Sequence, residues 1–266
     1  MHAFEYHRPA SAKDAVSLKA KKSEGKYLAG GQSLVQAMKL RLSSPSDLID
    51  LSSLKELTGI KVSGSAVEIG AMTRHADVAG SAEVKKAIPA LAALAREIGD
   101  RQVRHMGTIG GALANNDPAA DYPAAVLGLG ATITTNKRKI EADSFFKGLY
   151  ETALEEDELI TSVSFPVPKR AAYVKFKNPA SRFALVGVFV ADFGGKARVG
   201  VTGAGPCAFR QAEMEKALAS KFAPESVASV KVSSSGLNGD LHASPEYRAH
   251  LITVMARRAV EAALKS

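Results

Sequence analysis

The chain has 266 residues, enough for two domains of about 100–200 residues each, and 46% of its residues are apolar, as in an ordinary packed core. Its 35 basic and 27 acidic residues give a net charge of +8, but these charges are scattered and Trp is absent, so we expect no nucleic-acid partner. Cys207 is the one cysteine, so this chain alone cannot hold a disulfide, a four-thiolate zinc site or an iron–sulfur cluster.

Apolar runs in the sequence are short. The longest, residues 184–191, is far below the roughly 18 residues that a membrane helix needs, and no signal-like segment opens the chain. We therefore expect a cytoplasmic protein with no membrane span. The six histidines lack the spacing of a metal site, which indicates surface or capping roles and no metal centre.

In chain order, a short strand is predicted at 27–31, followed by a helix over 33–42 with apolar residues at helical spacing. Residues 59–70 alternate between apolar and polar around a tight turn, which predicts a hairpin. Apolar residues at helical spacing over 81–99, interrupted by Pro89, predict one kinked helix or two short ones.

The next predicted elements are a helix at 119–129, a strand at 131–135 with a hairpin turn at Asn136, a helix at 143–154 and a strand at 158–168. Prolines end this last strand, and we expect a domain boundary there, at 166–171.

Beyond the boundary, segments 183–193 and 196–205 flank paired glycines and predict the clearest hairpin of the sequence. Helices are predicted at 210–220 and 245–264, the second with Tyr247 among its core-facing residues, and a strand is predicted at 227–232. Residues 203–208 fit a G-x-G-x-x-A pattern, but Pro206 removes an amide from the turn, so we reject a Rossmann fingerprint.

Two glycine pairs are the candidate chemistry-bearing segments. AGGQS at 29–33 and TIGG at 108–111 each put adjacent glycines between an extended segment and a helix or turn. Successive backbone amides there can converge on an anion without obstruction by side chains. Either pair alone would more often be a simple turn. Two matching pairs favour the diphosphate of a dinucleotide, with Ser33 and Thr108 as hydroxyl donors.

Five segments in order carry a family resemblance: AGGQSLVQAMKLRL, IGAMTRHADV, RQVRHMGTIGGALANNDPAADYPA, KFKNPASRFALVGV and SPEYRAHLITVMARRAVEAA. They resemble the FAD-binding medium subunit of the molybdenum hydroxylases, such as the flavoprotein subunit of aerobic carbon monoxide dehydrogenase and the FAD domain of xanthine dehydrogenase.

The resemblance implies an α+β fold: a para-cresol-methylhydroxylase-type (PCMH-type) FAD-binding domain at 1–168, with subdomains at about 1–55 and 56–168, then a smaller α/β C-terminal domain at 171–266. It implies that both glycine loops hold the FAD pyrophosphate. Asn115 and Asp121 would lie near the ribityl and adenosine-side hydroxyls, Ile160 beside the flavin ring, and Lys177 facing the isoalloxazine. The implied cofactor-binding residues are Ala29, Gly30, Gly31, Gln32, Ser33, Leu34, Thr108, Ile109, Gly110, Gly111, Asn115, Asp121, Ile160 and Lys177.

From the residues alone, Asp121 is equally consistent with an acid at a helix N-terminus and Lys177 with a solvated strand lysine. The family further implies an electron-transfer role in a molybdenum-containing dehydrogenase, with no catalytic residue for substrate on this chain. Partners would be a small subunit with two-iron two-sulfur clusters and a large molybdenum-cofactor subunit, as a dimer of heterotrimers. A free-standing flavin oxidoreductase and a non-catalytic protein of the same fold are the alternatives.

Overall fold

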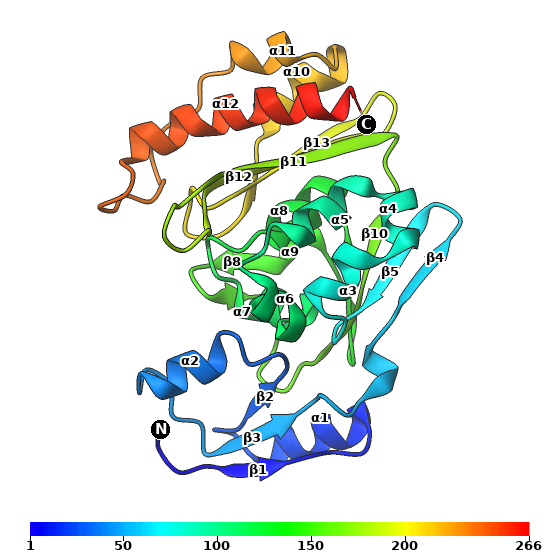
Figure 1. Cartoon of the computed structure of the whole chain (residues 1–266), viewed down its shortest axis with the longest axis vertical. Helices are drawn as coiled ribbons and strands as arrows, with labels where there is room; N and C mark the ends of the chain where they lie inside the picture. The colour runs from blue at the N-terminus through cyan, green and yellow to red at the C-terminus, as the bar shows by residue number, and fades with distance from the viewer. Residues whose placement is uncertain (266) are drawn as a thin grey trace.

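The computed structural model describes residues 1–265 and arranges most of the strands into three sheets stacked along the long axis of the molecule (Figure 1). At one end, three short parallel strands lie in the order β1 (Glu5–His7), β3 (Asp47–Asp50), β2 (Lys26–Leu28). Parallel neighbours need crossovers, which here contain α1 (Ala12–Lys21) and α2 (Leu34–Lys39).

Helix α2 is shorter than the predicted 33–42. Of the apolar residues with helical spacing in that prediction, only Met38 is buried within the helix, while Leu42 lies beyond its end and is 79% exposed. The helix ends because Arg41 adopts a left-handed φ of 61°, which an α-helix cannot continue through.

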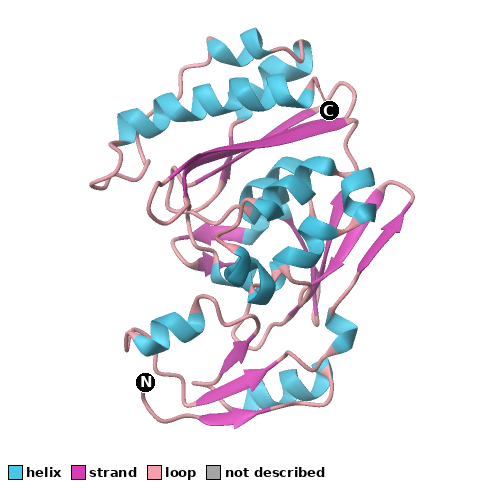
Figure 2. Cartoon of the chain, viewed as in Figure 1, coloured by secondary structure: helices cyan, strands magenta, loops and turns pink. Residues whose placement is uncertain are grey.

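The central sheet is antiparallel, and Figure 2 shows helices packed closely around it. Its order is β4 (Ile60–Ser63), β5 (Ala66–Gly70), β10 (Ile160–Pro166), β6 (Thr132–Thr135), β7 (Lys139–Glu141). The hairpins predicted at 59–70 and at Asn136 are therefore confirmed. The helices between β5 and β6 are α3 (His75–Gly80), α4 (Ala82–Ala87), α5 (Pro89–Arg96), α6 (Arg101–Met106), α7 (Ile109–Asn115) and α8 (Tyr122–Leu129). Pro89 begins α5, so the stretch at 81–99 forms two helices.

The third sheet has the order β11 (Arg170–Lys177), β12 (Ala184–Asp192), β13 (Ala197–Thr202), β14 (Phe209–Arg210) and is wholly antiparallel. All nine residues of β12 are buried because this sheet is covered on both faces. Val188 and Val190 contribute to the cluster formed with α12 (Pro245–Ala263), whereas Phe189 contributes to the central core. Because successive side chains of a strand point to opposite faces, β12 packs against α12 on one face and against the central core on the other.

The remaining helices and strands are short. They are η1 (Lys55–Leu57), α9 (Ala142–Phe145), β8 (Phe146–Gly148), β9 (Glu151–Thr152), α10 (Ala212–Ser220) and α11 (Pro224–Ala228).

The helix predicted at 143–154 is wrong beyond its first turn. The chain instead forms β8 and β9, joined by a turn in which Tyr150 has a φ of 56°. The buried Asn116 amide donates to the carbonyls of Gly148 (2.9 Å) and Glu151 (2.7 Å), and these bonds hold the turn in place. A tertiary contact, which no local pattern encodes, overrides the helical spacing here.

Two smaller expectations for the C-terminal part are also wrong. The segment predicted as a strand at 227–232 begins inside α11, which Pro224 starts, and pairs with no sheet. Tyr247 is 43% exposed, because it packs edge-on against the ring of Phe176 at the rim of the cluster. The segment at 203–208 connects the antiparallel strands β13 and β14, which agrees with the rejection of a Rossmann fingerprint.

The predicted division into 1–55, 56–168 and 171–266 is a proposal that the separate sheets support. The first sheet lies within 1–55 and the central sheet within 56–168, and the third sheet begins at Arg170, one residue before the third range. Ser266, the last residue of the third range, lies outside the described part of the chain. Among residues 1–265, none of the helices combines the length and the apolar character that crossing a membrane requires.

Candidate functional site

The first glycine loop follows β2 directly and offers a run of free backbone donors. Gly31 has a φ of 72°, a conformation that glycine adopts without strain. Within the described structure, the amides of five consecutive residues, Gly30 to Leu34, donate to no protein acceptor, although the carbonyl of Gly31 accepts from Val35 at 3.1 Å. Five neighbouring unpartnered amides are the kind of donor set that an anionic oxygen satisfies.

The two glycine loops lie in contact although about eighty residues separate them. A Cβ atom added at Gly30 would lie 2.1 Å from the carbonyl oxygen of Met106 and 2.7 Å from the Cα of Gly107. One added at Gly111 would lie 3.3 Å from the Cβ of Ala29. The structure therefore brings together the two segments that the sequence singled out, and glycine at position 30 is what permits the approach.

The second loop differs from the expected amide cradle. Its glycines lie in the first turn of α7, where Thr108 is the N-cap and its Oγ1 accepts from the Gly111 amide at 3.2 Å. The Ile109 amide donates to Thr73 (3.1 Å) and the Gly110 amide to Ala71 (2.8 Å), so both are already bonded. Gly110 is a packing glycine, because a Cβ there would lie 2.6 Å from that of Ala71.

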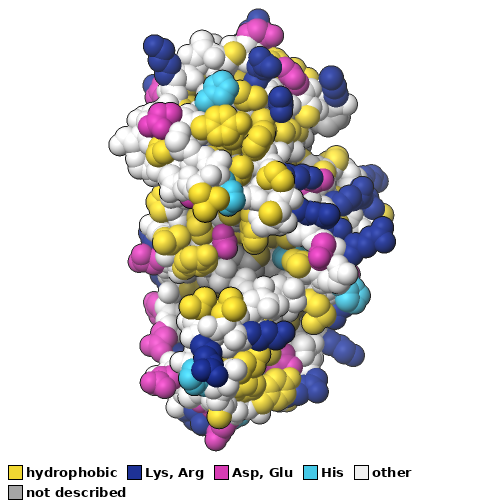
Figure 3. Space-filling model, turned by 60° about the vertical axis from the view of Figure 1, so that its left-hand side comes forward, with side chains coloured by type: hydrophobic (Ala, Val, Ile, Leu, Met, Phe, Trp, Pro, Cys, Tyr) yellow, Lys and Arg dark blue, Asp and Glu magenta, His cyan; other side chains and the backbone are white. Residues whose placement is uncertain are grey.

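One face of α7 nevertheless points toward the first loop. Thr108, Gly111 and Asn115 are spaced i, i+3 and i+7, which puts them on the same side of the helix, and Gly111 adjoins Ala29. In the view of Figure 3, the surface is hollowed between the lower part of the molecule, which holds the first three strands, and the body above it. The free amides of the first loop and the polar face of α7 together fit a diphosphate with hydroxyl-rich neighbours.

Side chains of the first loop add little of their own. Ser33 is exposed and makes no capping bond to α2, and Gln32 reaches only the carbonyl of Gly30, at 3.5 Å. The donors of this loop are therefore its backbone amides.

Asp121 lies in an internal network. Its Oδ1 accepts from the Tyr173 hydroxyl (2.5 Å) and from the Lys175 ammonium (2.9 Å), and Lys175 also donates to the carbonyl of Glu97 (2.8 Å). Asp121 is the N-cap residue of α8, as the helix-terminus interpretation expects, but its side chain makes no capping hydrogen bond. Burial raises the pKa of the Asp121 carboxyl, and Lys175 and Tyr173 act in the opposite direction.

Ile160 and Lys177, both predicted to lie near the flavin ring, belong to different surroundings. Ile160 is buried in the central core at the start of β10, one residue before Thr161, whose carbonyl accepts from the Ala71 amide at 2.9 Å. Lys177 ends β11 at the surface and forms an ion pair with Glu97. Among the described residues, these two side chains have no common hydrogen-bond or ion-pair partner.

His75 is a residue that sequence reasoning misplaced on the surface. It is buried, its amide donates to the Gly107 carbonyl at 2.9 Å, and its ring lies directly beside Gly107 at the start of the second loop. Burial, together with the nearby Arg104 guanidinium, lowers the pKa of His75 to about 4. The signal available in the sequence was its position in IGAMTRHADV, where it begins α3 shortly after β5 ends.

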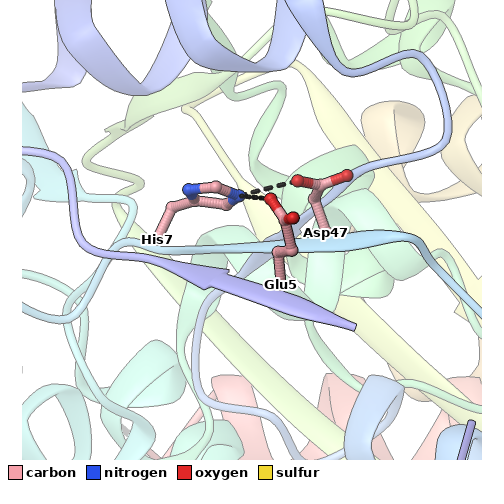
Figure 4. Close-up of side chains that lie close together, drawn as sticks. All are labelled: Glu5, His7 and Asp47. Atoms are coloured by element: carbon pink, nitrogen blue, oxygen red, sulfur yellow. Dashed lines mark hydrogen bonds and ion pairs between the residues drawn. The ribbon is translucent and has the colours of Figure 1, made fainter. Parts of the chain in front are cut away.

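Glu5, His7 and Asp47 gather three possible metal-ligating groups at the N-terminal sheet (Figure 4). His7 Nε2 lies 2.6 Å from an Asp47 oxygen, and Lys22 Nζ lies 3.1 Å from the same atom and 3.5 Å from Glu5. The Lys22 ammonium therefore already provides the cation of this cluster. A hydrogen bond from Ser46 and the contact with His7 lower the pKa of Asp47 to about 2.

Comparisons with known proteins agree with the geometry. A family described as the FAD binding domain in molybdopterin dehydrogenase matches residues 2–168. The carbon monoxide dehydrogenase medium chain of Afipia carboxidovorans is 37% identical, covering 98% of this chain and 96% of its own length. The nicotine 6-hydroxylase medium subunit of Paenarthrobacter nicotinovorans is 36% identical, with 97% and 96% covered.

Among solved structures, reconstituted CO dehydrogenase from Oligotropha carboxidovorans superposes with a TM-score of 0.91 at 35% identity, covering 98% of both chains. The fold and the matching family thus define an FAD-binding flavoprotein. The chain belongs to the family of FAD-binding domains in molybdopterin dehydrogenases, and it is an oxidoreductase flavoprotein of the α+β, PCMH-type fold expected from its sequence.

Proposed function

We propose that this chain is the FAD-binding electron-transfer subunit of a molybdenum hydroxylase complex, passing electrons from iron–sulfur clusters of a partner subunit through FAD to an external acceptor. The observation that carries the proposal is the contact between the two glycine loops, with five free amides beside the polar face of α7. Relatives of nearly the same length, named as medium chains or subunits of different dehydrogenases and hydroxylases, support it.

In this proposal, the protein residues bind and orient the cofactor. The amides of Gly30 to Leu34 would bind the pyrophosphate, and Thr108 would add a hydroxyl beside the Gly111 amide. Asn115, half-buried on the same helix face, would bond a hydroxyl of the ribityl or adenosine side, where Asp121 is also proposed. When bound, FAD supplies the ability to accept electrons singly and release them in pairs.

The same proposal places Ile160 and Lys177 near the flavin ring, Lys177 as a cation whose charge Glu97 partly offsets. Gln32 and Ser33 would contribute through their backbone. No general base for substrate chemistry is assigned to this chain, because in the proposed complex the substrate is oxidised on another polypeptide.

The other redox centres are proposed on partners: two-iron two-sulfur clusters on a small subunit and the molybdenum cofactor on a large one. Cys207, which is half-buried, is the single cysteine of the chain, and one thiolate cannot hold a cluster. This supports placing the clusters on a partner. A hetero-oligomer, specifically a dimer of heterotrimers, and a cytoplasmic location belong to the same proposal.

The proposal is tested by purifying the tagged chain from its native host and measuring FAD, iron and molybdenum in the same sample. We expect about one FAD per chain, with two co-purifying polypeptides that bring iron and molybdenum. A yellow chain without either metal, reduced directly by a small organic substrate, would establish the free-standing oxidoreductase instead. A colourless chain that FAD cannot reconstitute would establish a non-catalytic protein.

A further inference from the structure

Two residues with strained backbone meet beside the proposed cofactor site. Among residues 1–265, four residues other than glycine have a left-handed φ, and they include Asn116 (43°) and Tyr150 (56°). Asn116 immediately follows α7, and Tyr150 lies in the turn between β8 and β9, which Figure 1 shows next to α7. This conformation is uncommon for a residue with a side chain and persists only where the surrounding structure enforces it.

The side chain of Asn116 enforces it at the turn. It is fully buried, and its amide nitrogen donates to the carbonyls of Gly148 and Glu151, which flank the tip of the turn. Both amide hydrogens are therefore used, while the buried Oδ1 has no hydrogen-bond partner in the described part of the chain. The strain and the unpaired acceptor both lower stability, which indicates a function for the turn that these bonds hold.

The Tyr150 side chain reaches the connection between α7 and α8. Its hydroxyl donates to Asp117 Oδ2 at 3.3 Å, and because the side chain is 57% exposed, its ring keeps a free face for a flat ligand. Asp117 also lines a cavity of about 280 Å³ together with Asn178 and Phe183, which closely follow Lys177. Asp117 therefore links Tyr150 to the part of the chain where the proposed function places the flavin ring.

The polar face of α7 leads to the same place. Thr108 and Gly111, at the start of this face, lie beside the glycine loops, and Asn115 is at its other end. A dinucleotide that binds its pyrophosphate at the loops and runs along this face past Asn115 next meets residues 116 and 117. The link through Asp117 favours the flavin over the adenine as the ring at this end.

We propose that the Tyr150 ring forms a wall of the cofactor site at its flavin end, and that Asn116 is the positioning residue that holds it there. The assignment rests on the proposed function, because it requires bound FAD. Aromatic rings in offset or edge-on contact gain stability beyond the area that they bury. Asn116 acts only through the turn.

The test uses the FAD-loaded complex and measures the fluorescence lifetime of the bound flavin and the rate of FAD dissociation. A tyrosine ring in contact with the flavin quenches its fluorescence, so Tyr150→Ala should lengthen the lifetime and speed FAD release about two- to tenfold. Tyr150→Phe keeps the ring and should keep the slow release. Tyr6→Ala is the matched control and should match wild type. Tyr6 is 53% exposed and also bonded to a carboxylate, but it lies on β1, at the opposite edge of its sheet from β2 and the first glycine loop.

The role of Asn116 is tested by Asn116→Gly, which keeps the left-handed φ accessible and removes both bonds to the turn. This variant should change the lifetime and the FAD release in the same direction as Tyr150→Ala. The double variant should show no further change, because Asn116 acts through Tyr150. Asn136→Gly, which removes a side chain that accepts from the Leu159 amide at the turn between β6 and β7, should match wild type.

A wild-type lifetime and rate of FAD release in Tyr150→Ala would overturn the assignment and leave the proposed function intact. An Asn116→Gly variant that behaves as wild type, or whose effect adds to that of Tyr150→Ala, would overturn the positioning role. Tyr150→Ala leaves the bonds of Asn116 intact and decides the assignment even if Asn116→Gly fails to fold. A wild-type complex that contains no flavin would instead contradict the proposed function.

Discussion

Asp121 and Lys175 form an ion pair inside the protein. Their side chains are 4% and 1% exposed, and Nζ lies 2.9 Å from Oδ1. The pair joins the N-terminus of α8 to the middle of β11, so it ties the central core to the C-terminal sheet. A buried pair contributes little relative to well-packed apolar residues, but either charge left alone is costly.

Replacing Asp121 by Asn should therefore lower the free energy of unfolding by about 3–5 kcal/mol, because Lys175 keeps a buried charge without a carboxylate. Urea unfolding followed by circular dichroism measures this. Asp77→Asn, at an exposed position of α3, is the control and should change stability by less than about 0.5 kcal/mol. The double variant with Lys175→Met should recover part of the loss; if it is no more stable than Asp121→Asn, the charge argument is wrong.

Gly30→Ala should separate the two glycine loops. The new Cβ would lie 2.1 Å from a backbone oxygen, a contact that only movement of the backbone relieves. We expect the flavin to protein ratio of the purified protein to fall at least about tenfold, with the circular dichroism spectrum retained. Gly80→Ala, where nothing lies within 4 Å of the added atom, should keep its flavin. Full flavin content in Gly30→Ala would show that the loop contact does not form the binding site.

His75 should make the protein less stable in mild acid. The pKa of its ring is about 4 when folded, because of burial and Arg104, against about 6.5 in the unfolded chain. The unfolded chain therefore takes up the proton first, and stability that is present at neutral pH is lost as the pH falls through this range.

At pH 5 the loss from His75 alone is about 2 kcal/mol. Urea unfolding at pH 7 and pH 5 gives the free energies of unfolding of wild type and His75→Gln. The advantage of wild type over His75→Gln should be smaller at pH 5 by that amount. His105→Gln, at an exposed position, should follow the wild-type pH dependence. Parallel curves for wild type and His75→Gln would mean that the ring is already protonated or exposed.

Local patterns were sufficient for much of the fold. The alternation at 59–70 and around Gly194 predicted two hairpins that the structure contains, because one pleated face of each must be buried. The glycine pairs correctly marked two segments that meet. The sequence could not predict that the amides of the first pair are free and the Gly110 amide is bonded. The Gly110 amide donates to Ala71, which follows another strand.

Long-range contacts account for what the sequence could not predict. The side chain of Asn116 converts a helical pattern at 143–154 into a hairpin turn from more than thirty residues away. His75 was taken as a surface residue because burial of a lone histidine depends on the packing around it, here against Gly107.

Lys177 and Glu97 should shift the flavin potential in opposite directions. They form an ion pair at the surface, and a cation near the ring stabilises the anionic reduced form. Lys177→Met should lower the midpoint potential by on the order of 10–30 mV and Glu97→Gln should raise it by a similar amount, both small because the side chains are half-exposed. Lys169→Met, at the residue just before the opposite end of β11, is the control. Spectroelectrochemical titration of the FAD-loaded protein measures all three, and a midpoint unchanged in both Lys177→Met and Glu97→Gln would remove this pair from the surroundings of the flavin.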